Sequence, residues 1–439
     1  MTETGTANET VAGDGVPSLG AATRVWARIG VLSFGGPAAQ IALMHREVVE
    51  DRRWLSEQTF LNALSFCMLL PGPEAMQLAT YAGWRMHGTV GGLVAGLLFV
   101  LPGAALMLLL AALYVTFGAL PLVQALFLGV KAAVLVIVIE ALLRISRRAL
   151  TRPLHYWIAA GAFVALFVFD APYPLVIATA AAVGLVSGNG SGTAGEVAQG
   201  GASVSHWGTV RTILVWLALW WCPLLLLEFV FSGQVLGEIG RFFSVLATVT
   251  FGGAYAVLAY MAQEAVSGFG WLSAAEMADA LGLAETTPGP LILVTEFVGF
   301  LAAARDGAGV PDLVMGAAGA AVTLWATFVP CFLWVFAGAP YIEQLHAMPR
   351  LKSALDAITA AVVGVILNLS IWFALQVTFS DVARQEFGPL RPLVPDVTTL
   401  DWRVPVLTLV AGLLMLRLHK GIPLTLAVCA LLGLLLAQV

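Results

Sequence analysis

The feature that most constrains this chain is a set of long apolar stretches that contain no charged residue. No Asp, Glu, Lys or Arg occurs in 86–130, 313–342, 357–380 or 421–439. Each stretch is about as long as the roughly 20 apolar residues that a membrane-spanning helix requires, or longer. Charged residues make up only 11% of the chain, against about 25% in soluble domains. We therefore expect an all-α polytopic integral membrane protein, which excludes the soluble enzyme classes.

The polar side chains give no sign of a nucleic-acid, metal or cofactor site. The net charge is −5 and the basic residues form no long run, so nucleic acid is not an expected partner. The four cysteines contain no C-x-x-C pair, and the six histidines lack the spacing of a zinc motif. The expected partner is the lipid bilayer, and a homodimer stays open.

The chain also carries an internal duplication. At an offset of 217 residues, positions 24–73 match the chain itself with 17 identities in 50, where composition alone would give about four. Phe34-Gly35-Gly36 falls on Phe251-Gly252-Gly253, and Pro71-Gly72-Pro73 falls on Pro288-Gly289-Pro290. Further along the chain, the match resumes at an offset of 228. We expect the two halves to share one fold.

Five segments are predicted along the chain. They are a mobile N-terminal tail at 1–21, a first transporter repeat at 22–187, a Gly/Ser-rich linker at 188–209, an extra transmembrane helix at 210–232 and a second repeat at 237–438. Proline, glycine and apolar patterning predicts the same order of helices in both repeats. The first repeat is expected to have helices at 22–45, 58–70, 74–86, 89–117, 120–148, 153–169 and 172–187, and the second at 239–263, 273–287, 291–304, 313–339, 353–379, 402–418 and 421–438.

The orientation of the repeats depends on the segment around the first Pro-Gly-Pro motif. A basic loop that contains Arg144, Arg147 and Arg148 is expected to be cytoplasmic, since short loops rich in Lys and Arg resist translocation. If the broken segment at 58–86 crosses the membrane once, the repeats are inverted; if it dips in and returns, they are not. We favour inverted repeats, because duplicated transporters commonly have that arrangement.

The two Pro-Gly-Pro motifs interrupt stretches that would otherwise continue as helix. Proline removes a backbone donor and clashes with the preceding turn, so each motif is expected to end one half-helix and begin another. In a membrane, such broken backbone is tolerated where it is buried in protein or lines a cavity. The second half-helix would then offer its free N–H groups and positive dipole end to an anion. A proline kink without a ligand is the alternative, but two motifs at equivalent positions favour a site.

The paired glycines of Phe-Gly-Gly are predicted to lie inside the first helix of each half. Glycine costs stability there, so it indicates either close packing of helices or approach of the backbone to a ligand. Neighbouring hydroxyl, amide and ammonium groups would add donors to an oxyanion. The predicted substrate-binding residues are Ser33, Phe34, Gly35, Gly36, Pro71, Gly72, Pro73, Gln77, Lys131, Thr250, Gly252, Gly253, Thr287, Pro288, Gly289 and Pro290.

Carboxylates within apolar surroundings are functional candidates by default. Glu74 directly follows the first Pro-Gly-Pro motif and is the first choice for a proton-coupling residue. Glu47 and Glu264 occupy the same position in the two halves, and Glu296 follows the second motif. A carboxylate that only terminates a helix is the alternative for each of them.

Together, these motifs resemble the chromate ion transporter family in its long, two-domain form. The likeness rests on Phe-Gly-Gly-Pro at 34–37, the stretch 45–55, the first Pro-Gly-Pro motif with Gln77 behind it, and weaker echoes in the second half. The resemblance implies export of chromate through the bacterial inner membrane, driven by the proton motive force and giving chromate resistance. Ala254 stands where the first half has Pro37, so we expect the halves to divide the labour unequally.

Three alternatives to chromate export stay open at this stage. Sulfate or another anion is one, since sulfate and chromate are both tetrahedral dianions that helix-end N–H groups distinguish poorly. A channel or passive scaffold is another. A polytopic membrane enzyme is the third, although the chain contains no H-E-x-x-H or G-x-S-x-G motif, and no catalytic residue is assigned. The chain also lacks the G-x-x-x-x-G-K-[ST] motif of an ATP-driven pump.

Overall fold

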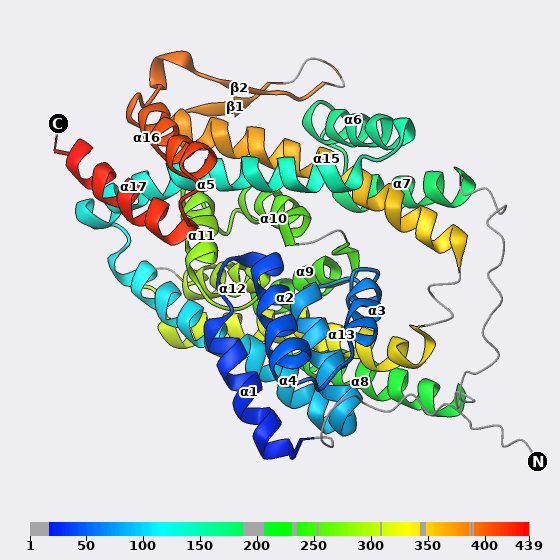
Figure 1. The fold of residues 1–439 in the computed structure, drawn as a ribbon. Helices are drawn as coiled ribbons and strands as arrows, with labels where there is room; N and C mark the ends of the chain where they lie inside the picture. Colours follow the sequence, from blue (N-terminus) through cyan, green and yellow to red (C-terminus); the bar gives the residue numbers. More distant parts are fainter. Residues whose placement is uncertain are drawn as a thin grey trace, which may run out of the picture.

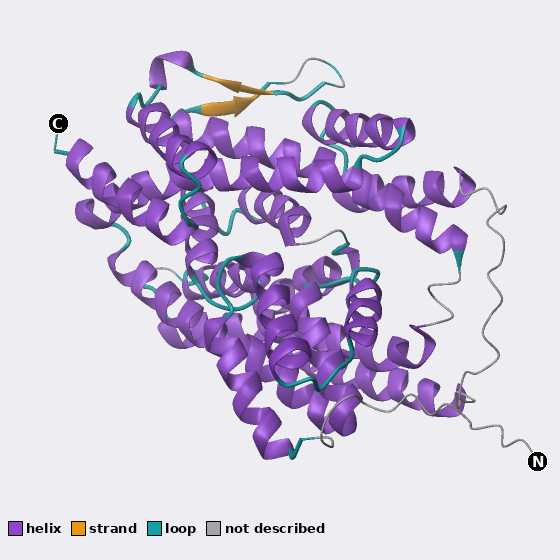
Figure 2. Cartoon of the chain, in the orientation of Figure 1, coloured by secondary structure: helices purple, strands orange, loops and turns teal. Residues whose placement is uncertain are grey.

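The computed structural model is helical along most of its length (Figures 1 and 2). It describes residues 17–187, 206–230, 235–251, 254–307, 310–342, 348–385, 388 and 390–438. Most of the predicted N-terminal tail and linker lies outside the described residues, and so do Gly252 and Gly253.

Five helices in the described part of the chain are long and apolar enough to cross a membrane. They are α4 (Glu74–Phe117), α5 (Pro121–Ala149), α8 (His206–Val230), α13 (Leu313–Gly338) and α15 (Pro349–Thr378). The class of polytopic helical membrane protein is thereby confirmed. Helix α8 begins at His206, inside the segment predicted as linker.

The two long helices α5 and α15 lie side by side in the upper part of Figure 1. Each packs against the closing pair of helices from the other half of the chain: α15 packs on α6 and α7, and α5 packs on α16 and α17. The bounds of these four helices are Pro153–Phe167, Tyr173–Ser187, Arg403–Gly412 and Ile422–Leu436. The two halves are therefore interleaved rather than separate.

The remaining short helices lie below α5 and α15 in Figure 1, and most of them pack on α4 or α13. In the first half they are α1 (Leu19–Leu32), α2 (Gly36–His45), η1 (Arg46–Asp51) and α3 (Glu57–Cys67). In the second half they are α9 (Val235–Val249), α10 (Ala254–Gln263), η2 (Glu264–Gly268), α11 (Ala274–Thr286), η3 (Leu291–Leu293) and α12 (Val294–Ala304). Helix α1 packs on α4 and α9 packs on α13, so each half places its first helix in the same way.

The prediction of one continuous helix at 22–45 is wrong. Helix α1 ends at Leu32 and α2 begins at Gly36, with Gly35 and Gly36 at φ of 87° and 76°. Only glycine adopts this left-handed backbone without steric cost, so the paired glycines break the helix instead of lying inside it. The second half is interrupted in the same place, between the end of α9 and the start of α10.

Helix α4 is a hairpin of two helices, and its division at His87 and Gly88 agrees with the predicted helices at 74–86 and 89–117. His87 and Gly88 have non-helical backbone angles, and the chain reverses there. The two arms touch where both are glycine: a Cβ atom on Gly83 would lie 2.3 Å from the carbonyl oxygen of Gly91. The hairpin therefore depends on small residues that let two backbones approach closely.

One small element departs from the all-α prediction. Strands β1 (Val382–Arg384) and β2 (Leu393–Pro395) pair antiparallel between α15 and α16. This connection is more polar than its neighbours, and a short turn, η5 (Val397–Thr399), ends it. A further short helical segment, η6 (Leu413–Arg417), continues α16. A last short turn, η4 (Ala339–Tyr341), extends α13.

Candidate functional site

The two Pro-Gly-Pro motifs are each hydrogen bonded to the opposite half of the chain. The backbone N–H of Gly72 donates to the carbonyl oxygen of Thr250 at 2.9 Å, and that of Gly289 donates to the carbonyl oxygen of Ser33 at 2.8 Å. Thr250 and Ser33 are equivalent positions at the offset of 217, directly before Phe-Gly-Gly. We call the two contacts the first crossing point (Gly72 and Thr250) and the second crossing point (Gly289 and Ser33).

A helix of the opposite half lies directly against each motif. A Cβ atom on Gly103 of α4 would lie 2.1 Å from the carbonyl oxygen of Pro288, and one on Gly72 would lie 2.8 Å from Cys331 Sγ on α13. Positions 103 and 331 correspond at the offset of 228. Gly72 and Gly289 have φ of 122° and 88°, which side chains rarely tolerate. Sequence reasoning missed Gly103 and Cys331, since neither contact is local.

Two buried glutamines hold backbone carbonyl groups of the motifs. Gln40 Nε2 donates to the carbonyl oxygen of Gly289 at 2.6 Å, and Gln77 Nε2 donates to that of Pro71 at 2.7 Å. The Oε1 atoms of both glutamines are buried and accept no hydrogen bond from the described residues. An unsatisfied acceptor of this kind is rare in a folded interior. Gln77 was predicted, whereas Gln40, whose equivalent is the apolar Val257, was not.

The predicted hydroxyl donors form hydrogen bonds within their own helices. Ser33 Oγ donates to the carbonyl oxygen of Ile29 at 2.6 Å, and Thr250 Oγ1 donates to that of Leu246. Thr287 Oγ1 likewise donates to a carbonyl oxygen of α11. In this structure, therefore, these hydroxyl hydrogens do not point toward a shared anion site.

The two motifs differ in how far they are buried. Pro71 and Pro73 of the first motif are partly exposed, whereas all three residues of the second motif, Pro288 to Pro290, are buried. Phe34, next to the second crossing point, is 45% exposed. We call the partly exposed first motif open and the buried second motif closed, although their sequences are equivalent.

The carboxylates that follow the motifs also differ. Glu74 lies at the start of α4 and is partly exposed. Glu296 lies in the first turn of α12 and is buried, and its Oε2 atom has no hydrogen-bond partner among the described residues. A buried carboxyl group without a partner is costly unless it is neutral. Both remain candidates for carrying a proton, one at each motif.

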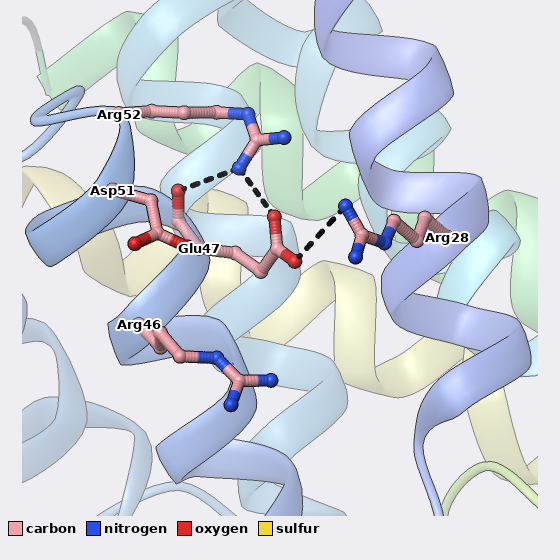
Figure 3. A pocket seen from close by; sticks show the side chains of 5 residues that line it. All are labelled: Arg28, Arg46, Glu47, Asp51 and Arg52. Atoms are coloured by element: carbon pink, nitrogen blue, oxygen red, sulfur yellow. Dashed lines mark hydrogen bonds and ion pairs between the residues drawn. The ribbon is translucent and has the colours of Figure 1, made fainter.

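Glu47 lies in a cluster of charges that Figure 3 shows around a cavity of about 630 Å³. Its buried carboxylate forms ion pairs with Arg28 of α1, at 3.6 Å, and with Arg52. Arg46 and Asp51 also line the cavity. The prediction of a proton-coupling role for Glu47 did not include these ion pairs. Two guanidinium groups neutralise the carboxylate, which thereby connects α1 to η1. Its equivalent, Glu264, is partly exposed on η2.

Lys131, the predicted cation for an anion, is already paired. Its Nζ atom lies 3.0 Å from Asp279 Oδ1, and the hydroxyl of Tyr114 donates to Asp279 Oδ2 at 2.6 Å. Lys131 belongs to α5, Tyr114 to α4 and Asp279 to α11. Sequence reasoning missed Asp279 and Tyr114. The signal available was a carboxylate in the half-helix before the second motif, where the first half has Asn62.

Known proteins with related sequences are transporters. A family model described as chromate transporter matches residues 21–185 and 237–434. A probable chromate transport protein of Synechococcus elongatus is 30% identical over 349 residues, which cover 80% of this chain and 83% of the relative. A chromate transport protein of Pseudomonas aeruginosa is 32% identical over 360 residues, covering 77% of each, and one of Cupriavidus metallidurans is 30% identical over 360 residues, covering 79% of this chain and 80% of the relative. No solved structure matches the chain.

Proposed function

Because the chain belongs to the chromate transporter family, we propose that it exports chromate across the bacterial inner membrane and so confers chromate resistance. Family membership supports the transport of chromate across a membrane. The direction of transport and its driving force are part of the proposal. The observation that carries it is the pair of crossing points, at which broken helices bring backbone from both halves together.

Transport by a fixed site requires that the two sides of the membrane reach it in turn. The interleaved halves supply two equivalent crossing points, one with an open Pro-Gly-Pro motif and one with a closed motif. We propose that the halves are inverted repeats and that the open and closed conditions exchange between them during transport. Inverted repeats with a site at their interface operate in this way in other secondary transporters.

The proposed site recognises an anion by backbone dipoles rather than by a free cation. The half-helices that follow the motifs present their N-terminal ends there, where a negative charge is stabilised. Lys131 adds a positive charge on α5, but in this structure Asp279 neutralises it. Chromate and sulfate both suit such a site, since both are tetrahedral dianions, and the family relationship favours chromate.

Uptake of radiolabelled chromate into vesicles that contain the purified full-length protein tests the proposal. We expect saturable uptake that is absent from vesicles without protein and from vesicles carrying Gly72→Leu, because a large side chain at position 72 would collide with Cys331 and Gln77. The effect of excess sulfate on chromate uptake measures the selectivity between the two anions. The proposal would be refuted if folded and inserted protein accumulated chromate no faster than protein-free vesicles do. Chemical conversion of chromate by the protein would point to an enzyme.

A further inference from the structure

The ion pair between Lys131 and Asp279 joins two helices of different halves of the chain, α5 and α11. Helix α11 is the half-helix that leads into the closed second motif, and α5 is one of the two long central helices. The side chains of Lys131 and Asp279 are 17% and 8% exposed, and Tyr114 completes the contact from α4. Charges inside a membrane protein are expensive and tend to be functional. Loss of one partner would leave the other charge buried and unpaired.

The face of α11 that meets α5 is packed closely. A Cβ atom on Gly282, one turn after Asp279, would lie 2.5 Å from Val130 Cγ1 of α5. Ala278 and Asp279 are buried at this contact. Figure 1 shows α11 directly below α5.

The equivalent face of α3 in the first half is uncovered. At the offset of 217, the positions that match Ala278 and Asp279 are Leu61 and Asn62. Both are exposed, and so is Ser65, the equivalent of Gly282. Helix α11 packs on α5 and α15, whereas the main packing partner of α3 is α4. The equivalent faces of α3 and α11 are therefore buried to different extents. The face of α11 is packed against α5, whereas that of α3 is exposed.

The duplication identifies the surface on which α3 would dock. Helix α15 corresponds to α5 at the offset of 228, and Thr359 of α15 stands where α5 has Lys131. Docking of α3 on α15 would bring Asn62 to Thr359, which is a polar pair without charge. Thr359 is partly exposed and lies on the described part of α15. A charged pair is thus possible between α11 and α5 but not between α3 and α15.

We propose that α11 and α3 dock alternately, α11 on α5 in this state and α3 on α15 in the other, and that Lys131, Asp279 and Tyr114 form a latch for this state. The inference rests on the proposed transport function. Asp279 and Lys131 are positioning residues: they hold the second motif closed, and their contact breaks in each transport cycle. Because the latch is present on one side only, it biases the resting protein toward the state seen here.

Labelling of single cysteines tests the alternation in the full-length protein. Asn62→Cys and Thr287→Cys, each in a transport-active background whose four native cysteines are replaced by alanine, report the α3 face and the second motif. We expect a membrane-impermeant maleimide to label position 62 readily and position 287 slowly. Removal of the latch by Lys131→Met with Asp279→Asn leaves no unpaired charge. It is expected to slow labelling at 62 and accelerate it at 287, each by about threefold or more.

The opposite signs of the two changes separate alternation from damage to the fold. Loosened packing would accelerate labelling at both positions, and that result, or no change at either, would overturn the proposal. Failure of position 62 to react in the parent protein would overturn it as well, because the α3 face would then lie in lipid. The labelling needs no substrate, so it tests the latch even if the transported anion proves not to be chromate.

Two matched variants complete the test. Glu140→Gln removes an exposed ion pair with Arg144 on the same helix α5, and we expect it to leave labelling at both positions and the transport rate unchanged. Asn62→Asp with Thr359→Lys installs the latch in the other half. It is expected to accelerate labelling at position 287, whereas the like-charged pair Asn62→Lys with Thr359→Lys is not. Equal labelling in these last two variants would contradict a latch based on charge.

Discussion

At the scale of single residues, the absence of a side chain at position 103 decides whether the second motif fits against α4. A methyl group there would lie 2.1 Å from the carbonyl oxygen of Pro288 and 2.6 Å from Leu293 Cδ1. A backbone carbonyl group cannot turn aside as a flexible side chain can. The contact therefore tolerates nothing larger than a hydrogen atom.

We expect Gly103→Ala to destabilise the protein by about 1–3 kcal/mol, the usual cost of overpacking, and to reduce chromate transport. Gly161→Ala is the matched control. Gly161 also lies in a helix, but a Cβ atom added there has nothing within 4 Å, so alanine is expected to stabilise α6 by about 0.5–1 kcal/mol. Thermal unfolding in detergent and vesicle transport measure both effects. Equal melting temperatures for the two variants would show that the close approach is absent.

At the scale of elements, the half-helices after the two motifs begin in different surroundings. The first arm of α4 begins at Glu74, which is partly exposed, whereas α12 begins near Glu296, which is buried. A carboxylate at the N-terminal end of a helix is stabilised by the helix dipole and competes with a bound anion for the same N–H groups. A proton on that carboxyl group would remove the competition.

Glu74→Gln is therefore expected to bind chromate but to lose the dependence of transport on an imposed pH gradient. Transport in vesicles, measured with and without that gradient, provides the test. Glu296→Gln is the comparison, because its side chain lies at the closed motif. Should Glu296→Gln alone abolish the pH dependence, the proton pathway would belong to the second half, and Glu74 would have no coupling role.

At the scale of the whole molecule, the double negative charge of the proposed substrate favours the proposed direction of transport. A dianion that leaves a negative cytoplasm gains about 4.6 kcal/mol per 100 mV, which corresponds to a concentration ratio on the order of 10³. Five helices in the described part of the chain are long and apolar enough to cross the membrane that separates the two sides. Export can therefore be driven by the membrane potential alone, and coupled protons would add to it.

We expect a potassium diffusion potential, negative on the side that contains chromate, to accelerate its movement across vesicles that carry the protein. A potential of the opposite sign is expected to slow it. The rate is followed with radiolabelled chromate at equal pH on both sides. Rates that are the same at both signs of potential would mean that the transport cycle moves no net charge.

Local sequence predicted the elements that proline and glycine define. The two arms of α4 fall where 74–86 and 89–117 were predicted, because proline and the glycine after His87 act on their own segment of backbone. A continuous helix was predicted across Phe-Gly-Gly, where the structure has a break. A pair of glycines is compatible with either a continuous helix or a break. Gly35 and Gly36 adopt left-handed angles next to Ser33, which is hydrogen bonded to the other half, and no local pattern contains that contact.

The sequence by itself determined that this is a membrane protein and predicted that its two halves are related, since long charge-free runs and repeated motifs can be recognised without knowledge of the fold. Only the tertiary structure decided which partner each key residue meets. Lys131 is paired with Asp279, Glu47 with two arginines, and the first and second motifs are open and closed. Equivalent sequences form equivalent contacts at the two crossing points, but the burial of the two motifs and the pairing of Lys131 differ between the halves, because each depends on residues that lie far away in the sequence.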